Sequence, residues 1–156
     1  MEKNKLEINT KVVAEIANSH QGNIQNAIKL ANECVKAGAD AIKFQVYTAN
    51  ELLHKKHKRF DHFKNQSFNS SEWNLIFSKV KKNKTKIFCD VFGEDSFNIC
   101  NNNIKVDGFK IHSSDLINEN LLNLVSSSKK KFYFLSTGGS TLREISYAVS
   151  FFKRKN

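Results

Sequence analysis

Short apolar runs alternate with longer amphipathic runs along most of the chain. The short runs are rich in Val, Ile, Phe and Tyr, and each falls within the roughly four to eight residues typical of a buried parallel strand. They lie at Lys11–Ala17, Ala41–Tyr47, Lys86–Phe92, Val106–His112 and Lys131–Ser136. The pattern therefore predicts five strands.

The runs between these strands have the period of amphipathic helices. From Ile24 to Val35, apolar side chains recur at i, i+3 and i+4, and Gly38 follows as a left-handed C-terminal cap. Thr141 and Glu144 have the spacing of a capping box. The predicted helices are Asn23–Ala37, Ser71–Lys82, Glu94–Asn102, Ile117–Ser126 and Thr141 to about Arg154. We expect the polar stretch Thr48–Asn69 to be a long loop.

Regular alternation of strand and helix predicts an α/β domain with parallel strands and right-handed crossovers. Two architectures fit this pattern: an open doubly wound sheet and a β/α barrel. A complete barrel needs eight βα units and about 250 residues. The 156 residues hold five or six units, so counting alone favours the open sheet.

Composition narrows the class of protein further. No apolar run is long enough to cross a bilayer, and the N-terminus lacks the apolar segment of a secretory signal, so we expect a soluble cytoplasmic protein. Cys34, Cys89 and Cys100 form no C-x-x-C pair, which favours free, reduced thiols.

The net charge of +10 fits an anionic substrate, a nucleic acid or a Lys-rich surface without a specific partner. Two of the lysine clusters lie where helices should end, and cations are favourable there. Nucleic acid is therefore the weakest of these three readings, and we expect no membrane partner.

Polar side chains lie at the end of every predicted strand, which is where a parallel α/β fold places its site. In chain order they are Glu15, His20, Lys43, Gln45, Asp90, Lys110, His112, Ser113, Asp115 and the run Ser136–Gly139. Lys43 and Gln45 are two residues apart and so share one face of a strand, as do Lys110 and His112.

Two interpretations of these residues remain open. Lysines inside a sheet need counter-charges, and Glu15, Asp90 and Asp115 could supply them in a buried ionic network without catalysis. Alternatively, Lys43 and Lys110 bind a substrate phosphate or carboxylate, assisted by the glycine-rich start of the last helix. His20 fits a capping or packing role as well as a catalytic one. No histidine spacing matches a closed zinc site, so no metal ligand is assigned.

Four motifs resemble the sialic acid synthase (N-acetylneuraminate synthase) family. Ala14–Asn23 is similar to the family's opening strand and turn, and Ala37–Gln45 to its second-strand motif. Phe109–Asp115 and Leu135–Ser140 resemble its fourth and fifth strands. The motifs come in the family's order and cover nearly the whole chain.

This resemblance implies a TIM-type β/α barrel, here incomplete with about five βα units, and makes residues 1–156 a single N-terminal portion of it. It implies an enzyme that condenses phosphoenolpyruvate with an N-acylated amino sugar such as N-acetylmannosamine. The product is a nine-carbon 2-keto sugar acid. A divalent metal, manganese or magnesium, is expected for the family.

The resemblance also assigns roles to individual residues. Glu15 matches an acid that handles a proton, and Asp115 matches a Glu near the reacting centre. The residues matching substrate ligands are Lys43, Gln45, Lys110, Ser113 and Ser136.

Three features depart from the family. Asp90 stands where a Ser/Thr-Pro-Phe-like motif has its hydroxyl, and His112 replaces a Gly. The chain stops after the fifth unit, so the metal-binding histidines of the later strands are absent from it. The alternative function is therefore a catalytically incomplete remnant or anion-binding module. Two open strand edges predict association with another copy or with a missing C-terminal half.

Overall fold

A computed structural model of the chain describes residues 10–80 and 84–153, which form one five-stranded parallel sheet with flanking helices. The strands are β1 (Val13–Ala17), β2 (Ala41–Val46), β3 (Lys86–Val91), β4 (Gly108–Ile111) and β5 (Phe132–Leu135). Each pairs in parallel with the next. All five predicted strands are confirmed, with ends that agree within two residues.

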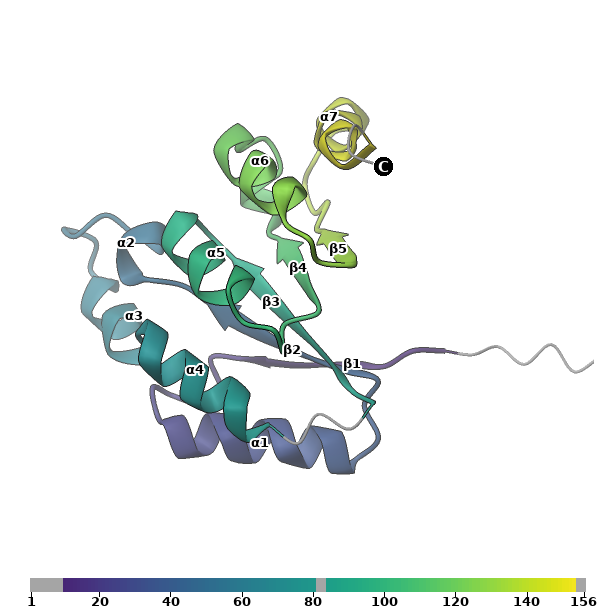
Figure 1. Ribbon diagram of the computed structural model, residues 1–156. Helices are drawn as coiled ribbons and strands as arrows, with labels where there is room; N and C mark the ends of the chain where they lie inside the picture. Colours follow the sequence, from purple (N-terminus) through teal and green to yellow (C-terminus); the bar gives the residue numbers. More distant parts are fainter. Residues whose placement is uncertain (1–9, 81–83, 154–156) are drawn as a thin grey trace, which may run out of the picture.

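The strands follow one another across the sheet in sequence order, β1-β2-β3-β4-β5. Right-handed crossovers that always step in the same direction place every helix on the same side of the sheet. Figure 1 shows this arrangement, with the helices on the outside of a curved sheet. The order matches the barrel-type fold that the resemblance implied. The open doubly wound sheet favoured by counting is wrong, because that fold reverses its strand order at a switch point.

The five predicted helices are confirmed. They are α1 (Ile24–Lys36), α4 (Ser70–Lys79), α5 (Glu94–Asn101), α6 (Glu119–Ser127) and α7 (Leu142–Lys153). The predicted ends at Lys82 and Arg154 lie outside the described residues. Gly38 follows α1 with φ of 87°. At the start of α7, the Thr141 N–H donates to Glu144 Oε2 at 2.7 Å and the Glu144 N–H donates to Thr141 Oγ1 at 3.3 Å, which confirms the capping box.

The expected loop over Thr48–Asn69 is wrong, because this stretch contains two short helices, α2 (Ala49–Leu52) and α3 (Phe60–Gln66). The Thr48 N–H donates to Glu51 Oε2 at 2.9 Å, which fixes the first turn of α2. In α3, the Phe63 ring packs edge-on against Tyr47 at 5.8 Å. These helices are thus stabilised by local capping and an aromatic contact. They lack the long apolar stripe from which a helix is predicted in a sequence.

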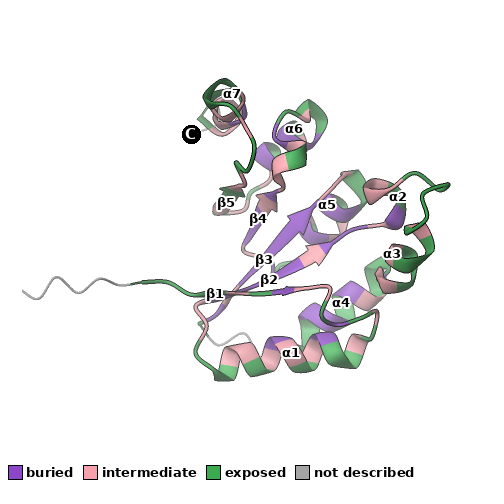
Figure 2. Cartoon of the chain, turned by 180° about the vertical axis from the view of Figure 1, so that it is seen from behind, coloured by how far each residue is buried: buried purple, intermediate pink, exposed green. Residues whose placement is uncertain are grey.

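The main core lies between the helices and the outer face of the sheet. Ile42, Phe44 and Val46 of β2 are completely buried there, and Trp73 of α4 packs edge-on against Phe44 at 5.5 Å. Figure 2 shows buried residues along β2, β3 and β4. This apolar face explains why the strand runs read as nearly continuous hydrophobic sequence.

The inner face of the sheet has a different composition. Charged side chains occupy it on β1 to β4, and Phe88, Phe132 and Phe134 form a cluster on β3 and β5, with ring centroids of Phe88 and Phe134 4.9 Å apart. Phe134 is 41% exposed because no further strand covers the β5 edge in the described part of the chain. Residues 10–80 and 84–153 include no helix with the length and apolar character needed to cross a bilayer.

Candidate active site at the carboxyl ends of the strands

Four side chains from four neighbouring strands meet on the inner face and form an ionic cluster: Glu15, Lys43, Asp90 and Lys110. Lys43 Nζ contacts the Glu15 carboxylate and lies 2.8 Å from Asp90 Oδ2. Lys110 Nζ lies 2.8 Å from the same Asp90 oxygen. Strand register brings them together, since Glu15 is opposite Lys43 and Asp90 is opposite Lys110.

Burial differs sharply across the ionic cluster. The Asp90 side chain has no exposed surface, those of Lys43 and Lys110 are 10% and 18% exposed, and that of Glu15 is 43% exposed. Burial acts to lower the pKa of Lys43, but its hydrogen bonds and charge interactions with Asp90 and Glu15 outweigh that effect and raise the pKa. Lys43 is therefore firmly cationic, and two carboxylates balance two ammonium groups.

Glu15 owes its orientation to an irregularity in β1. The pairing with β2 shifts register between Glu15 and Ala17, and Ala17 has φ of 45°. The Ala17 N–H donates to Glu15 Oε1 at 3.2 Å, while the other carboxylate oxygen contacts Lys43. The bulge thus holds Glu15 at the partly exposed mouth of the cluster.

The structure confirms Glu15 and Asp90 as counter-charges of the two lysines, whereas Asp115 does not have that role. Asp115 lies in the 3-10 turn η1 (Ser113–Asp115), where its carboxylate accepts hydrogen bonds from Ser114 Oγ and Asn118 Nδ2 at 3.1 and 3.4 Å. No ion pair joins it to the lysines within the described residues. The strand ends at Ile111, so the turn carries Asp115 away from the face of Lys110.

Gln45 and His112 extend the same face without an ion pair to the cluster among the residues described. Gln45 lies opposite Asp90 in the sheet register. His112 Nδ1 is 3.2 Å from Ser114 Oγ, and the His112 ring lies 6.0 Å from that of Phe92. Both therefore border the cluster at the ends of their strands.

Ser113 lies beside the glycine-rich loop between β5 and α7. A Cβ atom at Gly138 would lie 3.8 Å from Ser113 Oγ, and a groove of about 300 Å³ runs between the two segments. The Ser136 N–H donates to the Ile111 carbonyl at 3.0 Å, which extends the β4–β5 pairing to the loop. These contacts bring two predicted anion ligands, Ser113 and Ser136, to adjoining strand ends.

The start of α7 already holds a carboxylate. Glu144 Oε2 accepts from the Thr141 N–H and from Thr141 Oγ1, at 2.7 and 2.8 Å. These hydrogen bonds keep the pKa of Glu144 below its usual value. A ligand anion at this helix start would therefore lie near an ionised side chain.

Residues 28–156 match the family model described as the NeuB family. This range begins within α1 and includes β2 to β5, which carry Lys43, Asp90 and Lys110. The chain belongs to the NeuB family. The resemblance to sialic acid synthases that the motifs indicated is thereby confirmed.

Three proteins that are similar to this NeuB-family chain match most of its length. It is 34% identical to an uncharacterized protein of Methanocaldococcus jannaschii, covering 90% of this chain and 41% of that protein. It is 26% identical to a pseudaminic acid synthase of Campylobacter jejuni, covering 92% of this chain and 46% of that one. A solved structure of N-acetylneuraminic acid synthetase from Leptospira borgpetersenii superposes with a TM-score of 0.84 at 30% identity, covering 92% of this chain and 50% of that one. The chain thus spans about half the length of these relatives.

His20 of the NeuB-family chain packs in the core and makes no recorded contact with the ionic cluster. It is 1% exposed, and its ring lies 4.7 Å from Phe68 and 6.3 Å from Trp73. The Gly22 N–H donates to His20 Nδ1 at 3.1 Å, so this nitrogen is an acceptor. Of the two roles left open by the sequence, the geometry favours packing and turn formation. Burial lowers the pKa of His20.

We expect the protein to lose stability as the pH falls below about 6.5, the ordinary pKa of histidine. In that range unfolded His20 binds a proton, whereas buried His20 resists protonation until a lower pH. Its contribution is therefore complete above the unfolded pKa and is lost as the pH falls through the folded one. Urea denaturation across this range should show a shallower pH dependence in His20→Gln than in the wild type. Identical slopes would contradict this.

Tyr47 directly follows β2. In the sequence it reads as the last apolar residue of the predicted strand Ala41–Tyr47, so it is not included among the polar residues predicted at the strand ends. It is 2% exposed, and its hydroxyl donates to Asn18 Oδ1 at 3.0 Å. Burial raises the pKa of Tyr47 to about 12, so the hydroxyl stays protonated near neutral pH. The bond ties the segment after β1 to the segment after β2.

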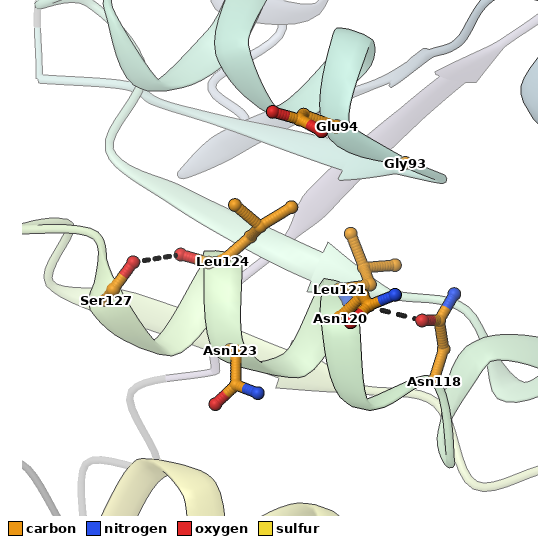
Figure 3. A pocket seen from close by; sticks show the side chains of 8 residues that line it. All are labelled: Gly93, Glu94, Asn118, Asn120, Leu121, Asn123, Leu124 and Ser127. Carbon is orange, nitrogen blue, oxygen red and sulfur yellow. Dashed lines mark hydrogen bonds between the residues drawn. The ribbon is translucent and has the colours of Figure 1, made fainter.

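A groove of about 710 Å³ lies between α5 and α6 (Figure 3), and none of the four residues of the ionic cluster lines it. Gly93 and Glu94 line one side, and residues 118–127 line the other. Two of its polar side chains bond to the backbone of α6: Asn118 Oδ1 accepts from the Leu121 N–H, and Ser127 Oγ donates to the Leu124 carbonyl. Glu94 is its one titratable lining residue, so we assign the chemistry to the ionic cluster instead.

The cysteines are free thiols, as the sequence predicted. Cys89 and Cys100 are buried, and burial raises the pKa of Cys100 well above its usual value. A protonated, inaccessible thiol is a poor nucleophile, so Cys100 belongs to the core.

Proposed function

We propose that this chain is the β1–β5 portion of a cytoplasmic synthase that condenses phosphoenolpyruvate with an N-acylated amino sugar, such as N-acetylmannosamine. The observation that carries the proposal is the ionic cluster on the inner face of four adjacent strands in a NeuB-family chain. The names of the Campylobacter and Leptospira relatives, which describe the synthesis of acidic sugars, support it. Free cysteines suit a reducing compartment.

In the proposed reaction, C3 of phosphoenolpyruvate forms a bond to the aldehyde carbon of the sugar while water adds to C2. The bond between C2 and the phosphate ester oxygen then breaks, and phosphate leaves. One proton of the water ends on the former aldehyde oxygen and the other on the released phosphate. The product is a nine-carbon 2-keto sugar acid. The substrate carries a phosphate and a carboxylate, so cations at the site would bind it and offset its charge.

The side chains divide into two proposed roles. Lys43 and Lys110 supply positive charge on the inner face, and Ser113 and Ser136 supply hydroxyl donors at neighbouring strand ends. Glu15 is the proposed proton carrier because it is the most exposed member of the cluster. A carboxylate in hydrogen-bond reach of a reacting group can accept or return its proton. Asp115 and Gln45 border this site from η1 and β2.

The proposed enzyme needs further strands to complete the barrel. This chain spans 41% and 46% of the Methanocaldococcus and Campylobacter proteins. Five strands are described, and β1 and β5 form the edges of their sheet. A barrel of this type has eight strands. A second copy would bring the total to ten, so the partner that fits is a segment with the remaining three βα units.

The described residues do not by themselves form a site for the divalent metal that the resemblance implies, since the resemblance places its histidine ligands on later strands. No group of three or more His, Cys, Asp or Glu side chains that could hold a metal ion occurs among them. The roles proposed for Glu15, Lys43 and Lys110 therefore depend on the side chains themselves.

The test is phosphate release from phosphoenolpyruvate in the presence of N-acetylmannosamine and manganese. The 156-residue chain is assayed alone and after co-expression with the remaining half of the Leptospira protein. We expect no turnover from the chain alone and release that requires both substrates from the assembled pair. A soluble, assembled pair that releases no phosphate would overturn the proposal.

A second candidate function is a catalytically incomplete remnant that performs no condensation. The contact of Asp90 with both lysines favours it, because a closed ionic network satisfies these charges without a substrate. Retained phosphoenolpyruvate binding by an assembled pair that shows no turnover would select this alternative.

A further inference from the structure

Asp90 lies at the point where two ammonium groups converge. A single oxygen, Oδ2, is 2.8 Å from Lys43 Nζ and 2.8 Å from Lys110 Nζ. The Asp90 side chain is completely buried, and its other oxygen, Oδ1, has no hydrogen-bond partner. The lysines available for a substrate anion are therefore already engaged by an anion of the chain itself.

The charges around Asp90 leave no surplus for a ligand. From β1 and β2 it is faced by Glu15, Lys43 and the neutral Gln45, and from β4 by Lys110. The two carboxylates cancel the two ammonium groups. A ligand phosphate close to the lysines would also lie a few ångströms from the Asp90 carboxylate, and a like charge at that range weakens anion binding by about tenfold or more.

We propose that Asp90 lowers the affinity of this site for anions, as an internal carboxylate that occupies Lys43 and Lys110 and opposes the entry of a second anion. A phosphate or carboxylate ligand reaches either ammonium group only by displacing the Asp90 oxygen from it. The inference rests on the proposed function in one respect, because that function is what assigns an anionic substrate group to these lysines.

The opposite role for Asp90 makes the opposite prediction. If Asp90 served only to orient the two lysines for a ligand, its removal would loosen them and weaken anion binding. If Asp90 competes with the ligand, its removal strengthens binding. The sign of the change in affinity therefore distinguishes competition with the ligand from positioning of the lysines.

The experiment measures inorganic phosphate binding to the 156-residue chain by isothermal titration calorimetry. Asp90→Asn keeps the shape of the side chain and removes its charge. We expect weak binding by the wild type and an affinity about tenfold or more higher in Asp90→Asn. The matched control is Glu33→Gln, which removes a carboxylate from an exposed ion pair with Lys36 on α1 and should bind like the wild type. Unchanged or weaker binding by Asp90→Asn overturns the proposal.

A double variant tests whether a gain in phosphate affinity arises at the pair of lysines. Adding Lys110→Gln to Asp90→Asn removes one of the two ammonium groups and returns the cluster to zero net charge. Phosphate affinity should then fall back toward that of the wild type. If the double variant binds as tightly as Asp90→Asn, the gain arises elsewhere and the assignment to this lysine pair is wrong.

Two further measurements keep the test decisive. If Asp90→Asn does not fold, as judged by circular dichroism, Asp90→Ser makes the same charge change. In the wild type, NMR with labelled lysine should show the ammonium resonances of Lys43 and Lys110 unmoved by micromolar phosphate, and shifts at that concentration would overturn the proposal. Phosphate binding is measured separately from turnover. A gain in phosphate affinity in Asp90→Asn without condensation in the assembled pair rejects only the proposed function, and turnover without such a gain rejects only the competing role of Asp90.

Discussion

Replacing Glu15 by Gln in the co-expressed pair is expected, under the proposed function, to lower the rate of phosphate release by about a hundredfold to ten-thousandfold, the usual contribution of one general acid or base. Gln has the size of Glu and keeps an oxygen toward the Ala17 N–H, but it cannot carry a proton. Glu15 is the member of the ionic cluster best placed for this role, since it is 43% exposed whereas Asp90 is fully buried.

The measurement is the phosphate-release assay on the co-expressed pair, with circular dichroism to confirm that the variant folds. Glu33→Gln is the matched control, because it also removes a carboxylate paired with a lysine but lies on α1, outside the site. It should retain normal turnover. Near-normal turnover by Glu15→Gln would remove Glu15 from the reaction.

Replacing Trp73 by Ala is expected to lower the free energy of unfolding by about 3–5 kcal/mol, the range for emptying a buried aromatic site. Trp73 is 1% exposed and stacks on Phe77 at 5.4 Å, with Phe44 and Phe68 edge-on at 5.5 and 5.2 Å. Ala would leave these rings around a cavity. Because domains are typically stable by only about 5–15 kcal/mol, such a loss takes much of the total.

Urea denaturation followed by circular dichroism measures the effect. Trp73→Phe should cost far less, since it keeps a ring and removes the Trp73 Nε1 donor, which is buried without a hydrogen-bond partner. Leu75→Ala, on the same helix at a 42% exposed position, should be nearly neutral. A loss below about 1 kcal/mol in Trp73→Ala would contradict the central place assigned to this side chain.

The strands and the longer helices could be predicted because their buried positions are occupied by apolar residues in a regular pattern. Residues 41–46 alternate between the helix-covered face and the inner face, yet five of the six are buried, so the run reads as apolar with Lys43 and Gln45 as the exceptions. The order of the strands in the sheet has no comparable pattern in the sequence. Counting residues pointed to an open doubly wound sheet, whereas the family motifs pointed to the sequential order that the sheet has.

The helices within Thr48–Asn69 escaped prediction because neither depends on a long apolar stripe. In α3 no residue is fully buried. The Glu51 carboxylate of α2 accepts hydrogen bonds from the backbone N–H of Thr48 and of Ser96, and the second partner lies far along the chain. A contact between segments so distant in sequence has no local pattern.

The residues of the candidate site could be identified from the sequence, but not the contacts between them. Spacing along β2 and β4 placed Lys43 and Lys110 on one face, and the need for counter-charges indicated Glu15 and Asp90. The convergence of both lysines on one Asp90 oxygen depends on strand register, which the sequence does not state. Asp115 was misplaced because strand alternation was carried past Ile111 into a 3-10 turn.

Trp73 is the single tryptophan of the chain, and its side chain packs from α4 against Phe44 of β2. Its fluorescence therefore reports on the β1–β2 side of the molecule, whereas circular dichroism averages over every helix, including α6 and α7. Coincident transitions from the two signals would mean that the sheet unfolds as one cooperative unit, and separate transitions would mean that the β4–β5 side opens independently. The position of one indole ring thus makes the native chain its own probe of how far cooperativity extends across the five-stranded sheet.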